Sequence, residues 1–235
     1  MHFAAFLDHS TQNVWKIPKT ILFSQGIDPR LFSSVDSLFS FFSHGKFSHP
    51  IREPAPDFKD SVYRAVSQIT AIPRYENFFT TTEIFDFSDL VLEFEGTTAH
   101  KYHDFSIRQT LLTPLSRRAF CRSKVSLAEH IYKINAHFWS YGIGFYRYAE
   151  LLGYENHGLS AEGQLLGFDL TGVTTSLGKM TSRIGPENQK FQVKVRALSQ
   201  LGRWIISNKD SNEFAEFCNQ HYSVQRLKEL WRSKI

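Results

Sequence analysis

The spacing of apolar residues predicts that this chain is built mainly from helices. Apolar positions recur every three or four residues in several segments, which is typical of helices with one buried face. The predicted helices cover residues 28–42, 60–69, 126–153, 186–207 and 211–235. The helix over 126–153 is expected to be interrupted at Gly142 or Gly144.

Three other regions have different patterns. Residues 76–96 alternate aromatic residues and threonine, which favours strand or irregular structure. Residues 97–112 are predicted to be a helix capped by Thr97 and Thr98, and residues 1–17 are apolar but too short to form a core. The sum is a mainly α protein with a small β element and a boundary near residues 118–125.

Composition limits the class of protein. The chain has 235 residues, of which 42% are hydrophobic and 21% are charged, enough for one large core or two small ones. No apolar run approaches the roughly 20 residues that cross a bilayer, and the first residues lack the features of a signal peptide. Cys121 and Cys218 form no CxxC motif, which fits a reducing compartment. We therefore expect a cytosolic protein.

The charge is unevenly distributed along the chain. Residues 1–118 contain 12 Lys and Arg against 13 Asp and Glu, whereas residues 119–235 contain 15 against 10, so the halves carry −1 and +5. A basic surface suits a polyanion such as nucleic acid or an acidic membrane face, and it also fits a solvated helix surface. Residues 76–95 contain six acidic and no basic residues, and solvated surface is the expectation there.

The stretch "AHKYHDFSIR", residues 99–108, contains the densest group of possible metal ligands or acid–base residues. On a helix, His100 and Asp104 would share a face, with His103 displaced by about 60°. A helical zinc site usually has two histidines four residues apart and a third ligand, and the HEXXH motif is absent. No GxSxG motif and no glycine-rich phosphate loop occurs. The sequence therefore predicts no metal, no cofactor and no catalytic residue.

Basic and aromatic residues that suit nucleic acid gather in the C-terminal half. They are Tyr146, Arg147, Lys179, Arg183, Lys190 and Lys194. Lys179 and Arg183 lie one helical turn apart, so both can point into the same groove. Aromatic rings stack any base at roughly 1–3 kcal/mol each, and basic side chains neutralise phosphates. Core packing is the alternative for the tyrosines and is favoured for Tyr148.

Several segments, taken in order, resemble the nucleocapsid proteins of orthobunyaviruses and their relatives in the peribunyavirus family. The family's His-Arg/Lys pattern, with an aromatic residue and an arginine following, is matched in "HKYHDFSIR". The other similar segments are "LFSFFSHGK", which ends in Lys46, "IGFYRY" at 143–148, "MTSRIG" at 180–185 and "SNEFAEFCNQHYSV" at 211–224. The family's Arg-Tyr-Gly is Arg-Ile-Gly here, and its arginine-rich middle loop has no match, so the resemblance is to a divergent member.

The resemblance implies two helical lobes, N and C, around a positively charged groove for single-stranded RNA. The lobes would cover residues 18–120 and 121–211, and short arms at 1–17 and 212–235 would dock on neighbouring protomers. Residues implied for RNA binding are Lys46, Lys101, Arg108, Tyr146, Arg147, Lys179, Arg183, Lys190 and Lys194. Residues implied for oligomerisation are Phe3, Phe6, Trp15, Phe214, Phe217, Tyr222, Leu227 and Trp231.

The expected function is that of a viral nucleoprotein of the virion and the host cytoplasm, not an enzyme. It would bind genomic RNA without sequence specificity, form rings or helical polymers, contact the viral polymerase and not insert into a membrane. Two alternatives from other classes stay open. One is a helical matrix or effector protein that binds lipid or a protein partner. The other is a metal-dependent nuclease that uses His100, His103 and Asp104.

Overall fold

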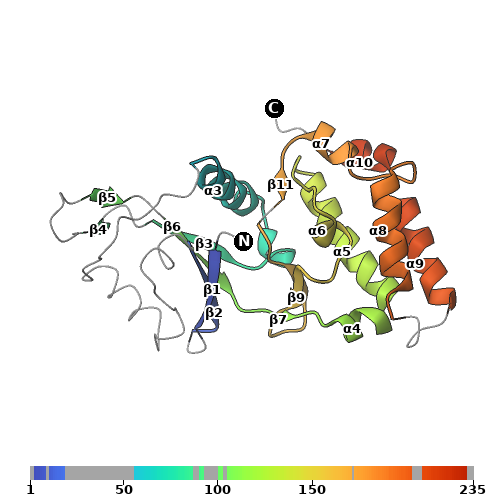
Figure 1. Cartoon of the computed structure of the whole chain (residues 1–235), viewed down its shortest axis with the longest axis horizontal. Helices are drawn as coiled ribbons and strands as arrows, with labels where there is room; N and C mark the ends of the chain where they lie inside the picture. The colour runs from blue at the N-terminus through green and yellow to red at the C-terminus, as the bar shows by residue number, and fades with distance from the viewer. Residues whose placement is uncertain are drawn as a thin grey trace. The chain divides into compact units, whose positions relative to one another are not determined.

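The computed structural model describes part of the chain, and that part divides into two compact units. The described residues are 3–8, 11–18, 56–86, 90–92, 100–102, 105–170, 172–202 and 208–231. Unit 1 takes its described residues from 1–66 and 81–111, and unit 2 takes its own from 67–80 and 112–235 (Figure 1). Both units therefore combine segments that are distant in the sequence, and the chain passes between them at Val66–Ser67, Thr80–Thr81 and Leu111–Leu112.

Unit 1 contains a four-stranded antiparallel sheet in the order β1-β2-β6-β3. The strands are β1 (Phe3–Asp8), β2 (Asn13–Pro18), β6 (Phe105–Thr110) and β3 (Thr82–Asp86). A separate pair joins β4 (Leu90–Leu92) to β5 (His100–Tyr102). The turn of the β1–β2 hairpin is closed by the Thr11 hydroxyl, which donates to the Asp8 carboxylate at 2.7 Å.

The core of unit 1 follows the two-residue alternation of its strands. Along β6, Ile107 and Gln109 are buried and Arg108 is half-buried, and the Gln109 amide donates to the Thr82 hydroxyl at 3.0 Å. Phe6 and Trp15 of the hairpin are also buried. The helix α3 (Pro56–Thr70), which confirms the helix predicted over 60–69, contributes Val62, Ala65 and Val66 to the buried residues of this unit.

The helix predicted over residues 97–112 is wrong. Residues 100–102 and 105–110 of this stretch lie in β5 and β6, and β6 pairs on one side with β2 and on the other with β3. Residues 105–110 form a strand although their local pattern predicts a helix. In the centre of the sheet their backbone N–H and C=O groups are paired with β2 on one side and with β3 on the other. Lys101 and Arg108 consequently do not share a helix face.

The segment expected to be an N-terminal arm is also part of this sheet. Residues 13–16 of β2 pair with residues 107–110 of β6, and β1 pairs with β2. Phe6 and Trp15 are 7% and 4% exposed within their own chain. Phe3 lies on β1, and its side chain is outside the described part of the structure.

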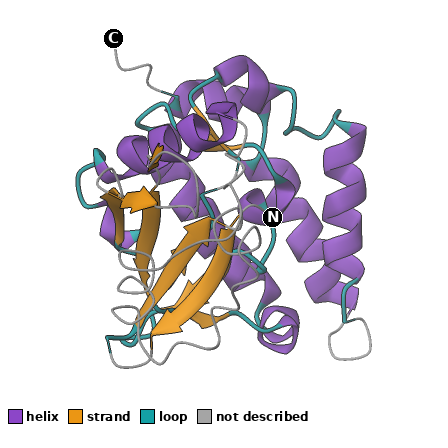
Figure 2. Ribbon diagram, turned by 60° about the vertical axis from the view of Figure 1, so that its left-hand side comes forward, coloured by secondary structure: helices purple, strands orange, loops and turns teal. Residues whose placement is uncertain are grey.

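Unit 2 is mainly helical (Figure 2). Its helices are α4 (Arg117–Arg122), α5 (Lys124–Trp139), α6 (Tyr148–Leu151), α7 (Leu177–Thr181), α8 (Gln189–Gln200), α9 (Asn208–His221) and α10 (Val224–Leu230), with the 3-10 helix η2 (Tyr75–Asn77). Helix α5 ends at Trp139 and the chain turns at Gly142, as expected from the glycines there. The described residues thus form a helix-rich fold that also contains strands.

The core of unit 2 lies between α5, α8, α9 and α10. Its fully buried members include Trp139, Met180, Phe191, Phe214 and Tyr222. The Tyr222 hydroxyl donates to the carbonyl of Leu151 at 2.7 Å and accepts from the Asn135 amide at 3.3 Å. A polar network that is paired in this way fixes how the helices are aligned.

The helix expected to be a C-terminal arm contributes to this core. Phe214 and Leu227 are 0% exposed and Tyr222 is 1% exposed, while Phe217 and Trp231 are half-buried against the same cluster. These side chains stabilise their own chain, since each buried aromatic or leucine contributes roughly 1.5–3 kcal/mol.

Small strands connect the helices of unit 2. The order β10-β9-β7 joins β10 (Leu165–Gly167), β9 (His157–Leu159) and β7 (Thr113–Pro114), and β8 (Gly144–Phe145) pairs with β11 (Val173–Thr174). The β8–β11 pair matters for function, because the chain runs from β8 into α6 and from β11 into α7.

Candidate nucleic-acid interface

Three of the residues predicted to bind RNA meet in unit 2. The Lys179 ammonium lies 3.7 Å from the centre of the Tyr146 ring, and the Arg183 guanidinium carbon lies 6.0 Å from it. Both are cation–π contacts, which the negative face of the ring stabilises. We call Tyr146, Lys179 and Arg183 the triad.

The position of Tyr146 is set by the β8–β11 pair. Its backbone N–H donates to the carbonyl of Gly172 at 2.9 Å, directly beside the paired strands. Gly172 has φ +98°, which favours glycine, and a Cβ there would lie 2.9 Å from Cγ of Arg147. The Arg147 side chain therefore crosses over Gly172, and Arg147 is the N-cap residue of α6.

The position of Lys179 is set by packing beneath α7. Met180 is fully buried, and a Cβ on Gly144 would lie 2.7 Å from its sulfur, so glycine is needed for α7 to approach β8. The Ser176 hydroxyl accepts from the Lys179 N–H at 3.2 Å and caps the helix. These contacts place Lys179 next to the ring of Tyr146, which is 33 residues earlier in the sequence.

Arg183 lies in the turn that joins α7 to α8. Its N–H donates to the carbonyl of Met180 at 3.0 Å, and Ile184 beside it is buried. The Asn188 amide donates to the carbonyl of Ser182 at 2.8 Å, and the same side chain caps α8. The turn is fixed at both ends, which holds the guanidinium near the ring.

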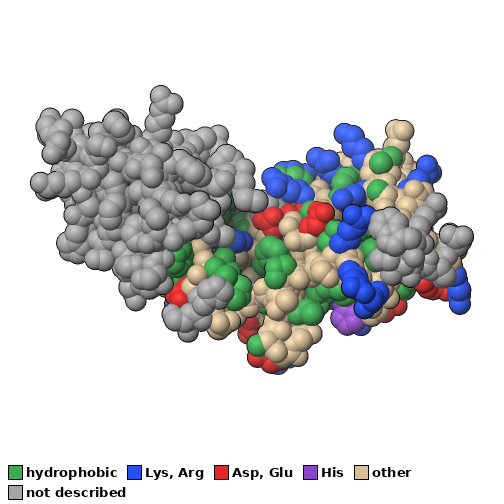
Figure 3. Space-filling view, turned by 60° about the horizontal axis from the view of Figure 1, so that its bottom comes forward, with side chains coloured by type: hydrophobic (Ala, Val, Ile, Leu, Met, Phe, Trp, Pro, Cys, Tyr) green, Lys and Arg blue, Asp and Glu red, His purple; other side chains and the backbone are tan. Residues whose placement is uncertain are grey.

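The triad combines accessible positive charge with an aromatic face. Lys179 is exposed, and Tyr146 and Arg183 are half-buried. Within the described residues, neither cation of the triad pairs with a carboxylate. Figure 3 shows Lys and Arg side chains spread over the visible face of the helical part, with Asp and Glu side chains at several places on the same face. Such a surface attracts polyanions.

The other residues of unit 2 that were predicted to bind RNA are close to the triad in the sequence but take no part in its cation–π contacts. Arg147 is exposed next to Tyr146. Lys190 and Lys194 lie one turn apart on α8, the first exposed and the second half-buried, beside the buried stripe that includes Phe191. Tyr148 packs against the Phe191 ring at 6.4 Å, which agrees with the core role favoured for it.

The predicted residues of unit 1 have other surroundings. Arg108 forms an ion pair with Glu83 of β3, directly across the strands, and lies 5.7 Å above the Trp15 ring. Lys101 lies on β5, opposite Val91. Lys46 falls outside the described residues. The structure thus joins Tyr146, Lys179 and Arg183 to one another, and it does not join Arg108 to that group.

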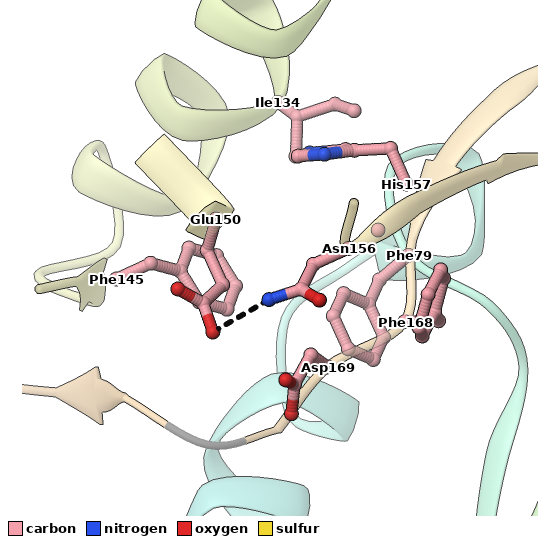
Figure 4. A pocket seen from close by; sticks show the side chains of 9 residues that line it. Phe79, Ile134, Phe145, Glu150, Asn156, His157, Phe168 and Asp169 are labelled. Atoms are coloured by element: carbon pink, nitrogen blue, oxygen red, sulfur yellow. Dashed lines mark hydrogen bonds between the residues drawn. The ribbon is translucent and has the colours of Figure 1, made fainter. Parts of the chain in front are cut away.

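A second site, which the sequence did not indicate, lies in unit 2 as a small pocket. Its lining includes Glu150 of α6 and His157 of β9 (Figure 4). It also includes Asn156, which precedes β9, and Asp169, which follows β10. The Asn156 amide donates to one carboxyl oxygen of Glu150 at 3.0 Å. Glu150 and Asp169 are 19 residues apart, and a single Glu in "YAELLG" is too weak a signal to indicate a site.

The pKa values of two groups in this pocket are strongly perturbed. Burial, and then the negative charge of Asp169, raise the pKa of Glu150 from 4.5 to about 8. Burial lowers the pKa of His157 from 6.5 to about 4, and its Nδ1–H donates to the carbonyl of Gly153 at 2.9 Å. At neutral pH both groups are therefore uncharged.

The nuclease alternative cannot be placed on the structure. His103 and Asp104 lie outside the described residues, and His100 is described only as part of β5. In the part of the chain that the structure describes, no three His, Cys, Asp or Glu side chains are grouped to hold a metal ion. In the same part, no helix is long and apolar enough to span a membrane.

No protein-family model matches this chain, and a search of curated proteins finds no significant match. The geometry of the triad and the motifs in the sequence are therefore the observations that bear on function.

Proposed function

We propose that this chain is a nucleoprotein that binds single-stranded RNA without sequence specificity through the triad in unit 2. The observation that carries the proposal is the convergence of Lys179 and Arg183 on the Tyr146 ring. The viral part of the proposal, the encapsidation of genomic RNA by a polymer of this chain in the virion, is supported by the order of the motifs in the sequence.

The chemistry of the triad fits a flexible single strand better than a duplex. An exposed base can stack on a tyrosine ring, while the two cations neutralise the phosphates on either side of that base. None of these contacts reads the edge of a base, so the affinity is expected to depend little on sequence. A protein that coats a genome needs this property.

The test is the RNA affinity of Lys179→Ala/Arg183→Ala, measured by fluorescence anisotropy with labelled oligouridine and oligoadenosine over a range of salt concentrations. The affinity should fall at least about tenfold for both oligomers, because two phosphate contacts are lost. The slope of log K against log salt should decrease by about 1.4, or about 0.7 for each contact with a single strand.

Lys133→Ala/Lys228→Ala is the matched control, since it removes the same charge from two exposed lysines on α5 and α10. An equal loss of affinity in this control would assign the binding to net charge and contradict the triad. Wild-type affinity in the Lys179→Ala/Arg183→Ala variant would also contradict the triad. Tyr146→Phe should retain binding and Tyr146→Ala should lose it, because the ring is what stacks.

The alternative functions predict different behaviour in the same preparation. Protein purified without nuclease should carry intact nucleic acid and show a raised ratio of absorbance at 260 and 280 nm. A matrix or effector protein would show no bound nucleic acid. A metal-dependent nuclease would shorten added RNA once a divalent cation is supplied, and His103→Ala would abolish this cleavage.

A further inference from the structure

The pocket beside the triad contains a buried carboxyl group that RNA binding does not use. Glu150 is 5% exposed. One of its carboxyl oxygens accepts from Asn156, and the other, Oε2, is buried with no hydrogen-bond partner among the described residues. An ionised carboxylate in this position lacks compensation for its lost hydration, so the protonated form is favoured.

The groups around Glu150 reinforce this preference. The charged and titratable ones are Arg147, His157 and Asp169. Asp169 opposes the ionisation of Glu150, whereas the exposed Arg147 favours it less strongly. His157 is buried and neutral, and the rest of the lining is apolar apart from Asn156, with Phe79 and Ile134 among its side chains. The cavity of about 10 Å³ has room for roughly one water molecule.

Glu150 and Asp169 both line this pocket, and both lie between β8 and β11 in the sequence. Glu150 comes five residues after Phe145 of β8, and Asp169 comes four residues before Val173 of β11. Figure 4 shows the Glu150 carboxyl directed at the Asn156 amide, with Asp169 among the other side chains that line the pocket. Repulsion between two carboxylates in a poorly solvated pocket would therefore separate α6 from the segment 167–170.

We propose that Glu150 is a pH-dependent latch, whose neutral carboxyl keeps α6 and the segment 167–170 together and whose ionisation, with release of one proton to solvent, lets them separate. Tyr146 follows β8 and Lys179 follows β11, so opening of the latch moves the ring away from the ammonium group. The consequence for RNA rests on the proposed function: the affinity should be high with the latch closed and lower with it open.

The first measurement is the hydrogen-exchange protection of the Tyr146 amide, which donates to Gly172, between pH 6.5 and 9. Wild-type protein should lose protection with a midpoint near pH 8. Glu150→Gln should show no transition, because it cannot ionise. Asp169→Asn should keep a transition at lower pH, because Asp169 is only the second cause of the shift.

The second measurement is the affinity for labelled oligouridine over the same pH range. Wild-type affinity should fall by roughly three- to tenfold between pH 7 and 9, since proton occupancy changes tenfold per pH unit beyond the pKa, and Glu150→Gln should bind equally at both pH values. Lysine and arginine stay charged in this range. Glu155→Gln, which changes an exposed neighbouring carboxylate, is the control and should behave as wild type.

The outcomes separate the two proposals. If RNA does not bind at any pH, the proposed function fails and the exchange data alone decide on the latch. A transition that persists in Glu150→Gln, or is missing in the wild type, overturns the latch. Suppression of the transition by millimolar magnesium or calcium would make the pocket a cation site and would also overturn it.

Discussion

Arg108 in unit 1 and Arg183 in unit 2 were both predicted from the sequence to bind RNA, and the structure surrounds them differently. Arg108 faces Glu83 across two strands. Arg183 faces the Tyr146 ring together with Lys179, and within the described residues no carboxylate pairs with it. A cation that is already neutralised by a neighbour contributes little to the binding of phosphate, so the position of acidic residues decides which basic residues are available.

The largest expected effect concerns unit 1. Deleting residues 1–18 removes β1 and β2 and exposes the edge of β6. We expect a destabilisation of more than about 3 kcal/mol, because Phe6 and Trp15 are lost from the core. In hydrogen exchange, the amides of β6 should lose protection while those of α5 keep it. A folded monomer with an intact β6 would instead support the arm predicted from the sequence.

The next effect concerns the stability of unit 2 as a function of pH. Between pH 4.5 and 8 the folded state keeps a proton on Glu150 that the unfolded chain releases, so the free energy of unfolding falls as pH rises. Between pH 4 and 6.5 the unfolded chain holds a proton on His157 that the folded state lacks, so that contribution rises with pH. Between pH 4.5 and 6.5, Glu150 and His157 change the free energy of unfolding in opposite directions as pH rises. Above pH 6.5, only the decrease caused by Glu150 remains.

The expected decrease is about 2 kcal/mol from pH 6.5 to 8, at roughly 1.4 kcal/mol per pH unit. Urea denaturation monitored by tryptophan fluorescence at pH 6.5, 7.2 and 8 measures it. Glu150→Gln should show a flat profile over the same range, and Glu155→Gln should follow the wild type. A flat wild-type profile would contradict the raised pKa of Glu150.

The smallest expected effect tests the comparison between Arg108 and Arg183. Arg108→Ala should change the free energy of unfolding by no more than about 1 kcal/mol, since partly exposed ion pairs contribute little. RNA affinity should stay within about twofold of wild type, as expected for a charge that is already paired. Arg183→Ala, measured in the same titration, should bind clearly more weakly. Equal losses in the two variants would show that the Glu83 pair does not neutralise Arg108.

The sequence by itself predicted the longer helices of unit 2, but the short helices α4 and α7 were not among its predictions. The apolar stripe around Phe191 and the break near Gly142 are local features, because each is set by residues a few positions apart. These elements are where the prediction from sequence and the structure agree.

Only the tertiary structure determined which segments of the chain contact one another. Residues 105–110 became a strand because β2 and β3, from distant parts of the chain, pair with it on both sides. Tyr146 reaches Lys179 through the packing of Met180 on Gly144, and Glu150 and Asp169 line the same pocket. Such contacts bring together residues that are tens of positions apart in the sequence, and the spacing of apolar residues within one segment does not predict them. Whether a basic side chain of this protein can bind phosphate therefore depends on the side chains that lie beside it in the folded structure.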